Sequence, residues 1–136
     1  MQKLYIVGCK PRISCPGVYV KGFVREEERL QLYKDASIFA MPSIYEPFGH
    51  SFLEAMAYKT PCIGSSKGAM LELIENGKTG FTAPVHDYMM LAERIGYLLE
   101  DENLRKKMGE EGRRRVETSF NWVTVAKKMT GQLENS

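Results

Sequence analysis

The sequence predicts an α/β fold in which helices cover both faces of a parallel sheet. Short apolar segments alternate with segments of helical periodicity along the chain, and this alternation is typical of parallel strands joined by helices. The 136 residues, 43% of them hydrophobic, suffice for one domain with one core. We therefore expect a single domain over residues 1–136, with ligands binding beyond the carboxyl ends of its strands.

Short apolar segments are predicted as strands. The third of them is followed by Pro42, and a short apolar run that ends at a proline is typical of a buried strand. Between the first and second strands, Pro11 and Pro16 favour a loop. In chain order, the predicted strands cover residues 4–7, 18–20, 37–41, 61–64 and 80–83.

The segments that follow the second and later strands are predicted as helices. Gly77 is the expected C-cap of one helix, and Asp87 is placed to cap the next. That next helix carries Leu91, Ile95 and Leu98 on one stripe, as a helix packed on a core does. In chain order, the predicted helices cover residues 26–36, 50–58, 69–76, a segment that begins after 87, 101–118 and 121–133.

The most informative stretch is residues 46–54, Glu-Pro-Phe-Gly-His-Ser-Phe-Leu-Glu, which leads from the third predicted strand into a helix. The free N–H groups of a first helical turn and the positive end of the helix dipole attract phosphate. Glu46 and Glu54 stand on either side, where each can accept hydrogen bonds from hydroxyl groups of the same ligand. Phosphate flanked by hydroxyl groups describes a sugar nucleotide, so this stretch predicts a site for one.

Two further features support a ligand site at this stretch. Gly49 has no Cβ, so a ligand can approach its backbone closely. Around the predicted helix, Ser51, Glu54 and Tyr58 share a side that lies away from Phe52. Glu54 can therefore face a cleft while the helix stays packed.

Other interpretations of the same residues stay open. Ser51 and Glu54 also fit a capping box, in which Glu54 only bonds the backbone at the helix start. Glu46, taken alone, is a solvated loop carboxylate. His50 is either a sugar contact or simply a residue at the helix start.

Composition argues against several classes of protein. The formal net charge of +2 is too small to indicate nucleic-acid binding, no apolar run reaches membrane-spanning length, and the N-terminus lacks the apolar core of a signal peptide. The three cysteines lack zinc-like spacing and are predicted to be reduced thiols of a cytoplasmic protein, with Cys62 in the core. The basic clusters at 105–107 and 113–115 are predicted to form a solvated helix face, with contact to an anionic membrane as the alternative.

Motifs along most of the chain are shared with one known family. They lie at residues 6–8, 22–24, 41–43, 45–49, 53–57, 68, 72, 74, 77, 80–81 and 120–122. With these motifs, the chain resembles the C-terminal, donor-binding half of a retaining GT-B glycosyltransferase of family 4 (glycosyl transferases group 1). The resemblance implies a Rossmann-like three-layer α/β/α domain that lacks the first strand–helix unit of its family.

The resemblance also implies roles for the residues that match the donor-site motif. Glu46 is expected near hydroxyl groups of the donor sugar, as the catalytic residue of the set, and Glu54 is expected on the ribose hydroxyls. The backbone N–H groups of Phe48, Gly49, His50 and Ser51 are expected to face the sugar and the diphosphate. The implied reaction transfers sugar from a nucleoside-diphosphate sugar to a saccharide or lipid-linked acceptor in carbohydrate biosynthesis, and it needs neither a metal nor a cofactor.

The acceptor domain of the family is absent from this sequence, so a truncated product, an excised domain and half of a split enzyme are the expected alternatives. We expect the chain alone to be inactive, with a separate N-terminal acceptor domain or a second copy as its partner. Trp122, Val125 and Met129 form one apolar stripe on the last predicted helix. We expect the segment near Trp122 to pack on this domain and the later turns to fray or to mediate a dimer. A noncatalytic nucleotide- or sugar-binding module, or an interaction subunit, is the alternative function, and a GT-B-like epimerase or phosphorylase is a third.

Overall fold

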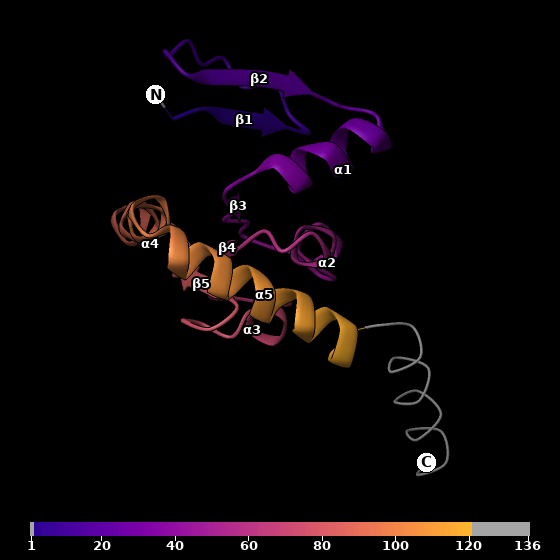
Figure 1. Cartoon of the computed structure of the whole chain (residues 1–136). Helices are drawn as coiled ribbons and strands as arrows, with labels where there is room; N and C mark the ends of the chain where they lie inside the picture. The colour runs from indigo at the N-terminus through magenta and orange to yellow at the C-terminus, as the bar shows by residue number, and fades with distance from the viewer. Residues whose placement is uncertain (1, 121–136) are drawn as a thin grey trace. The chain divides into compact units, whose positions relative to one another are not determined.

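A computed structural model describes residues 2–120 of the chain (Figure 1). The predicted helix over 121–133, with its apolar stripe, lies outside the described residues. The chain divides between Leu32 and Tyr33 into two compact units. The elements, in chain order, are β1 (Leu4–Val7), β2 (Val18–Gly22), α1 (Glu26–Asp35), β3 (Phe39–Met41), α2 (His50–Ala57), β4 (Cys62–Ser65), α3 (Met70–Leu73), β5 (Gly80–Ala83), α4 (Tyr88–Glu100) and α5 (Glu102–Ser119).

The first unit contains a parallel two-stranded ladder. Leu4 of β1 lies opposite Val18 of β2, and the Leu4 N–H donates to the carbonyl oxygen of Gly17 at 2.8 Å. At the other end of the ladder, the Gly8 N–H donates to the carbonyl oxygen of Gly22 at 2.7 Å. A loop connects the two strands, as its prolines predict, where a parallel crossover more often contains a helix.

The second unit contains the three-stranded parallel sheet β3–β4–β5, in which spatial order equals chain order. Phe39 pairs with Cys62, and Ser65 pairs with Ala83. The carboxyl ends of all three strands therefore lie at one edge of this sheet. The parallel pairing confirms the predicted α/β class, although the ladders form two sheets rather than the single sheet expected.

Helices bury the apolar surface of the second sheet. Ile63 of β4 and Phe81 of β5 form one buried cluster with Leu98 of α4 and Met108 of α5. Leu91 and Ile95 pack against this cluster, which confirms the predicted stripe on α4. Helix α5 also packs against α2 (Figure 1).

Side-chain caps begin the last two described helices. The Asp87 carboxylate accepts from the Met90 N–H at 3.0 Å, which confirms the predicted cap of α4. The Asp101 carboxylate accepts from the Leu104 N–H at 2.9 Å and caps α5 in the same way. No helix within residues 2–120 is long and apolar enough to cross a membrane.

The helix predicted over 69–76 is wrong in length, because α3 is one turn that ends at Leu73. Ile74 is already extended, with φ −103° and ψ 114°. The Thr79 hydroxyl accepts from the Glu75 N–H at 2.9 Å, so side-chain bonding favours a turn where the helix would continue. Gly77, at φ +85°, belongs to that turn and donates to the carbonyl oxygen of Gly80, so it is not the predicted C-cap.

Candidate functional site

The candidate site is built on the loop that leaves the carboxyl end of β3 and enters α2. The Ser65 hydroxyl, buried at the end of β4, donates to the carbonyl oxygen of Ser43 at 2.5 Å. This bond holds the start of the loop against the neighbouring strand. The loop therefore leaves the sheet at the edge where parallel α/β sheets bind their ligands.

Glu46 closes a tight turn within this loop. Its Oε1 accepts from the Gly49 N–H at 3.0 Å, and the residue is half-buried. The interpretation of Glu46 as a merely solvated loop carboxylate is therefore wrong. The same bond engages the Gly49 N–H, one of the backbone donors that we expected to face a ligand.

Glycine at position 49 is favoured by its backbone conformation and by a close neighbour. It is the N-cap of α2 at φ +70°, a conformation that L side chains rarely adopt. A Cβ at this position would also lie 2.2 Å from Cδ1 of Leu73. Close packing by Leu73 is thus a reason for glycine here that the sequence did not reveal.

Helix α2 begins at His50, and no side chain caps its N-terminus. Ser51 is then the second helical residue and Glu54 the fifth, so the capping-box alternative, which needs serine at the N-cap, is wrong. Phe52 is fully buried, whereas Ser51 and Glu54 are only partly buried. Glu54 therefore lies off the core face, as predicted.

Exposed aromatic side chains border the N-terminus of α2. Phe48 is 70% exposed and Tyr45 is 77% exposed. The exposed ring of His50 lies 5.8 Å from the Phe48 ring, between centroids. Planar surfaces, a carboxylate and helix-terminal N–H groups thus occur within one short segment, a combination suited to a polar ring-containing ligand.

A second loop, after β4, lies against Glu46. The Ala69 N–H donates to the carbonyl oxygen of Glu46 at 3.3 Å. Gly68, at φ +64°, approaches the same oxygen, which would lie 3.3 Å from a Cβ on that glycine. The structure therefore brings the predicted glycine segment near residue 68 into contact with the donor-motif segment.

Comparison with known proteins identifies the family. The profile of the family described as Glycosyl transferases group 1 matches residues 16–115, most of the chain. The chain belongs to this family. The match covers the whole loop from Glu46 to Glu54, the glycine segment and most of α5, so the candidate site lies within the glycosyltransferase domain.

Individual glycosyltransferases show the same relationship. A capsular polysaccharide biosynthesis glycosyltransferase of Staphylococcus aureus is 35% identical over 91 residues, which are 67% of this chain and 24% of the relative. The structure of a sucrose-phosphate synthase from Thermosynechococcus elongatus superposes with a TM-score of 0.83 at 32% identity, over 98% of this chain and 38% of the other. The structure of Anabaena HepE in complex with UDP-glucose gives a TM-score of 0.77 at 25% identity, over 89% of this chain and 33% of the other.

These comparisons confirm the predicted resemblance to the C-terminal half of a GT-B glycosyltransferase and its three-layer α/β fold. The chain spans between about a quarter and two-fifths of the length of these relatives. The glycosyltransferase domain described here is therefore one part of the enzymes that it matches.

Two arginines of the glycosyltransferase domain do not lie on the solvated face predicted for them. The Arg105 guanidinium donates to the carbonyl oxygens of Leu98 and Leu99 at 2.6 and 3.0 Å, at the end of α4. Arg115 donates to the end of α3. Its spacing of seven residues from the buried Met108 is the sequence signal that predicts an inward position.

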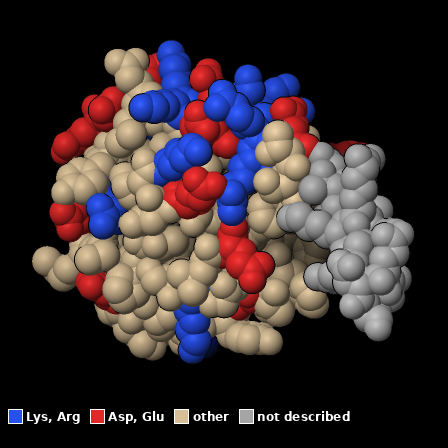
Figure 2. Space-filling model, turned by 90° about the horizontal axis from the view of Figure 1, so that it is seen from below, with Lys and Arg blue, Asp and Glu red and all other residues tan. Residues whose placement is uncertain are grey.

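Lys106 and Arg114 of α5 agree with a solvated face. Lys106 pairs with Glu102 at 3.2 Å, and Arg114 pairs with Glu111 at 3.0 Å. Figure 2 shows basic and acidic side chains interleaved on the face that it presents. Exposed pairs of this kind contribute little to stability, and they do not form a uniformly basic surface.

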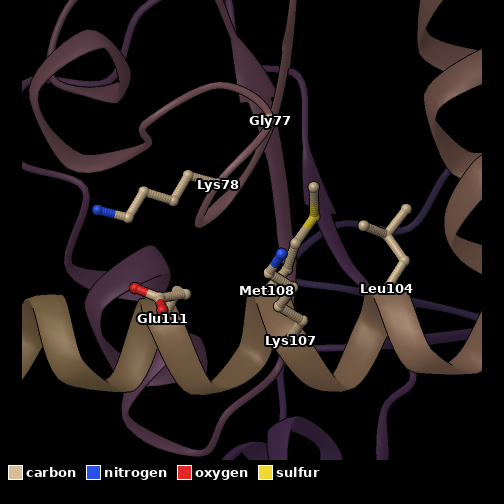
Figure 3. Close-up of a pocket in the computed structure, with 6 residues that line it drawn as sticks. All are labelled: Gly77, Lys78, Leu104, Lys107, Met108 and Glu111. Atoms are coloured by element: carbon tan, nitrogen blue, oxygen red, sulfur yellow. The ribbon is translucent and has the colours of Figure 1, made fainter.

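A shallow hollow of about 250 Å³ lies between α5 and the turn before β5 (Figure 3). Leu104 and Met108 line it from α5, and Gly77 and Lys78 line it from the turn. This turn enters β5 at its amino end, whereas the Glu46 loop leaves β3 at its carboxyl end. The hollow is therefore separate from the candidate site of the glycosyltransferase domain.

Proposed function

We propose that this domain binds the nucleoside-diphosphate sugar donor of a retaining, metal-independent glycosyltransferase. The N-terminus of α2 carries the proposal, because no side chain caps it and it follows the turn closed by Glu46. Unpaired N–H groups and the helix dipole at such a terminus favour a phosphate group. The diphosphate is thereby assigned to the start of α2, through the backbone of His50 and Ser51.

The two carboxylates are each assigned to a further part of the donor. Glu46, at the loop before α2, is assigned to hydroxyl groups of the sugar, and Glu54, one turn into the helix, is assigned to the ribose. Stabilisation of the leaving diphosphate by a helix terminus supplies the electrostatic part of catalysis without a metal ion. The same chemistry suits transfer to a saccharide or lipid-linked acceptor.

The relatives support a uridine nucleotide as the first donor to test, because the similar Anabaena structure contains UDP-glucose. They also support a separate acceptor domain as the partner, since this chain spans only part of each of them. Closure of two domains positions both substrates, and we expect the chain alone to bind donor without transferring sugar. All three cysteines are free thiols, which suits the reducing cytoplasm that we propose as its location.

Titration calorimetry on the 136-residue chain tests the proposal. The probes are UDP, GDP and ADP, each as the bare diphosphate and as its glucose or mannose derivative. We expect one base to be preferred and its sugar nucleotide to bind more tightly than the bare diphosphate. Absence of binding to every probe, in a sample with a cooperative unfolding transition, would contradict the proposal.

A further inference from the structure

Arg115 of α5 holds the end of the single-turn helix α3. Its Nε donates to the carbonyl oxygen of Leu73 at 2.9 Å, and one Nη group donates to the carbonyl oxygen of Glu72. The other Nη group pairs with the carboxylate of Glu75. The ring of Phe120 lies 5.4 Å from the guanidinium carbon, and only 23% of the arginine side chain is exposed.

Helix α3 depends on such a contact for its position. It contains four residues, and one isolated helical turn is not stable by itself in water. Its last carbonyl groups, those of Glu72 and Leu73, have no N–H donor within a helix that ends there. The Arg115 guanidinium supplies donors to both, and its positive charge suits the C-terminal end of the helix.

Helix α3 and the residue before it contact the candidate donor loop in two places. Just before α3, the Ala69 N–H donates to the carbonyl oxygen of Glu46 at 3.3 Å. At the end of α3, Leu73 fills the space beside Gly49, where its Cδ1 would lie 2.2 Å from an added Cβ. A displacement of α3 therefore moves the supports of both Glu46 and Gly49.

We propose that Arg115 is a positioning residue for the donor: it fixes α3, and α3 fixes Glu46 and the Gly49 cap of α2. This inference rests on the proposed donor-binding function. A planar guanidinium bonds several acceptors in fixed directions, whereas a lysine at the same position supplies a single point charge. Arg114 is the matched control, because it pairs with Glu111 of its own helix and is exposed.

Amide hydrogen exchange on the ligand-free 136-residue chain tests the positioning step without reference to function. In Arg115→Ala we expect exchange at the Ala69 and Gly49 amides to accelerate by about tenfold or more, the scale of losing a charged hydrogen bond. Exchange at Ile63, in the central strand β4, should stay unchanged in this variant. Arg114→Ala should leave all three amides unchanged. If Arg115→Ala does not fold, Arg115→Lys should show the same local pattern to a smaller degree.

Titration with UDP connects positioning to the donor, at a temperature where each variant is folded. We expect Arg115→Ala to bind about tenfold more weakly, and Arg114→Ala to bind as the wild type does. Uniformly faster exchange with unchanged UDP affinity would reduce Arg115 to a general stabilising residue and overturn the proposal. Absence of nucleotide binding by the wild type would overturn the donor function, while exchange at Ala69 and Gly49 would still decide whether Arg115 holds the loop.

Discussion

Gly109 of α5 lies directly against the backbone carbonyl of Lys59, which follows α2: a Cβ added to the glycine would stand 2.1 Å from that oxygen. Lys59 is itself at φ +61°, and its N–H donates to the carbonyl oxygen of Met56 at 3.0 Å. The carbonyl therefore belongs to backbone that ends a helix and cannot yield as a flexible side chain can. The close approach of α5 to the end of α2 depends on the missing side chain.

Gly109→Ala should destabilise the domain by about 1–3 kcal/mol, the range for forcing an extra group into a packed interface. Gly96→Ala is the matched control, because Gly96 lies within α4 and nothing stands within 4 Å of its added Cβ. That control should be neutral or should stabilise by up to about 1 kcal/mol through helix propensity. Urea denaturation measures the free energy of unfolding of both variants. Equal stability of the two variants would contradict the close packing of Gly109 on the Lys59 carbonyl.

Glu54→Ala should weaken binding of the preferred nucleoside diphosphate by about 1.5–3 kcal/mol, as expected for a lost hydrogen bond to a charged group. Glu110→Ala, at an exposed position of α5, should bind as the wild type does. Calorimetric titration compares the two. An unchanged affinity in Glu54→Ala would remove the assignment of this carboxylate to the ribose.

Substitutions of Glu46 should separate its role in the stability of the turn from its role in binding the sugar. Glu46→Ala leaves the Gly49 N–H without its acceptor and should cost about 1–3 kcal/mol of stability. Glu46→Gln keeps a side-chain oxygen and should recover most of that loss. Both variants should discriminate less well than the wild type between sugar nucleotide and bare diphosphate. Wild-type discrimination in the folded Gln variant would assign Glu46 to the turn alone.

Cys62 should contribute stability that is lost in alkali. Burial raises the pKa of its thiol above the ordinary value, so the folded chain keeps a proton that the unfolded chain releases above about pH 8.5. The contribution is therefore complete below that pH and falls as pH rises. Between pH 7.5 and 9.5, the free energy of unfolding of the wild type should fall by about 1.4 kcal/mol relative to that of Cys62→Ala, as measured by urea denaturation. A constant difference between them would show that the thiol ionises in the folded state.

Thiol labelling gives a check on the same burial. Cys9 and Cys15 are exposed and should react with a thiol reagent in the native chain, whereas Cys62 should react only after denaturation.

The sequence predicts this fold best where local patterns decide the structure. The cap at Asp87 needs only a side chain and the next turn of backbone, so its position follows from the sequence itself. The role of Arg115 could not be predicted in this way, because its acceptors in α3 lie about forty residues earlier in the chain.

The same distinction applies at the site. The donor motif is visible as a string of residues, and helical spacing predicted Glu54 on the side of α2 away from the core. The bond from the Gly49 N–H to Glu46, and the packing of Leu73 on Gly49, depend on how a loop folds and on a later helix. The length of α3 was missed for a related reason, since Thr79 competes for backbone that the helix would otherwise use.

The agreement between spatial and chain order in β3–β4–β5 has a consequence for synthesis on the ribosome. Each strand pairs with the one made just before it, so the sheet can grow at one edge as the chain emerges. No later strand has to insert between two that have already paired, which avoids reopening hydrogen-bonded backbone. The nascent sheet can thus acquire its order vectorially, and α5 emerges after its three strands to cover it.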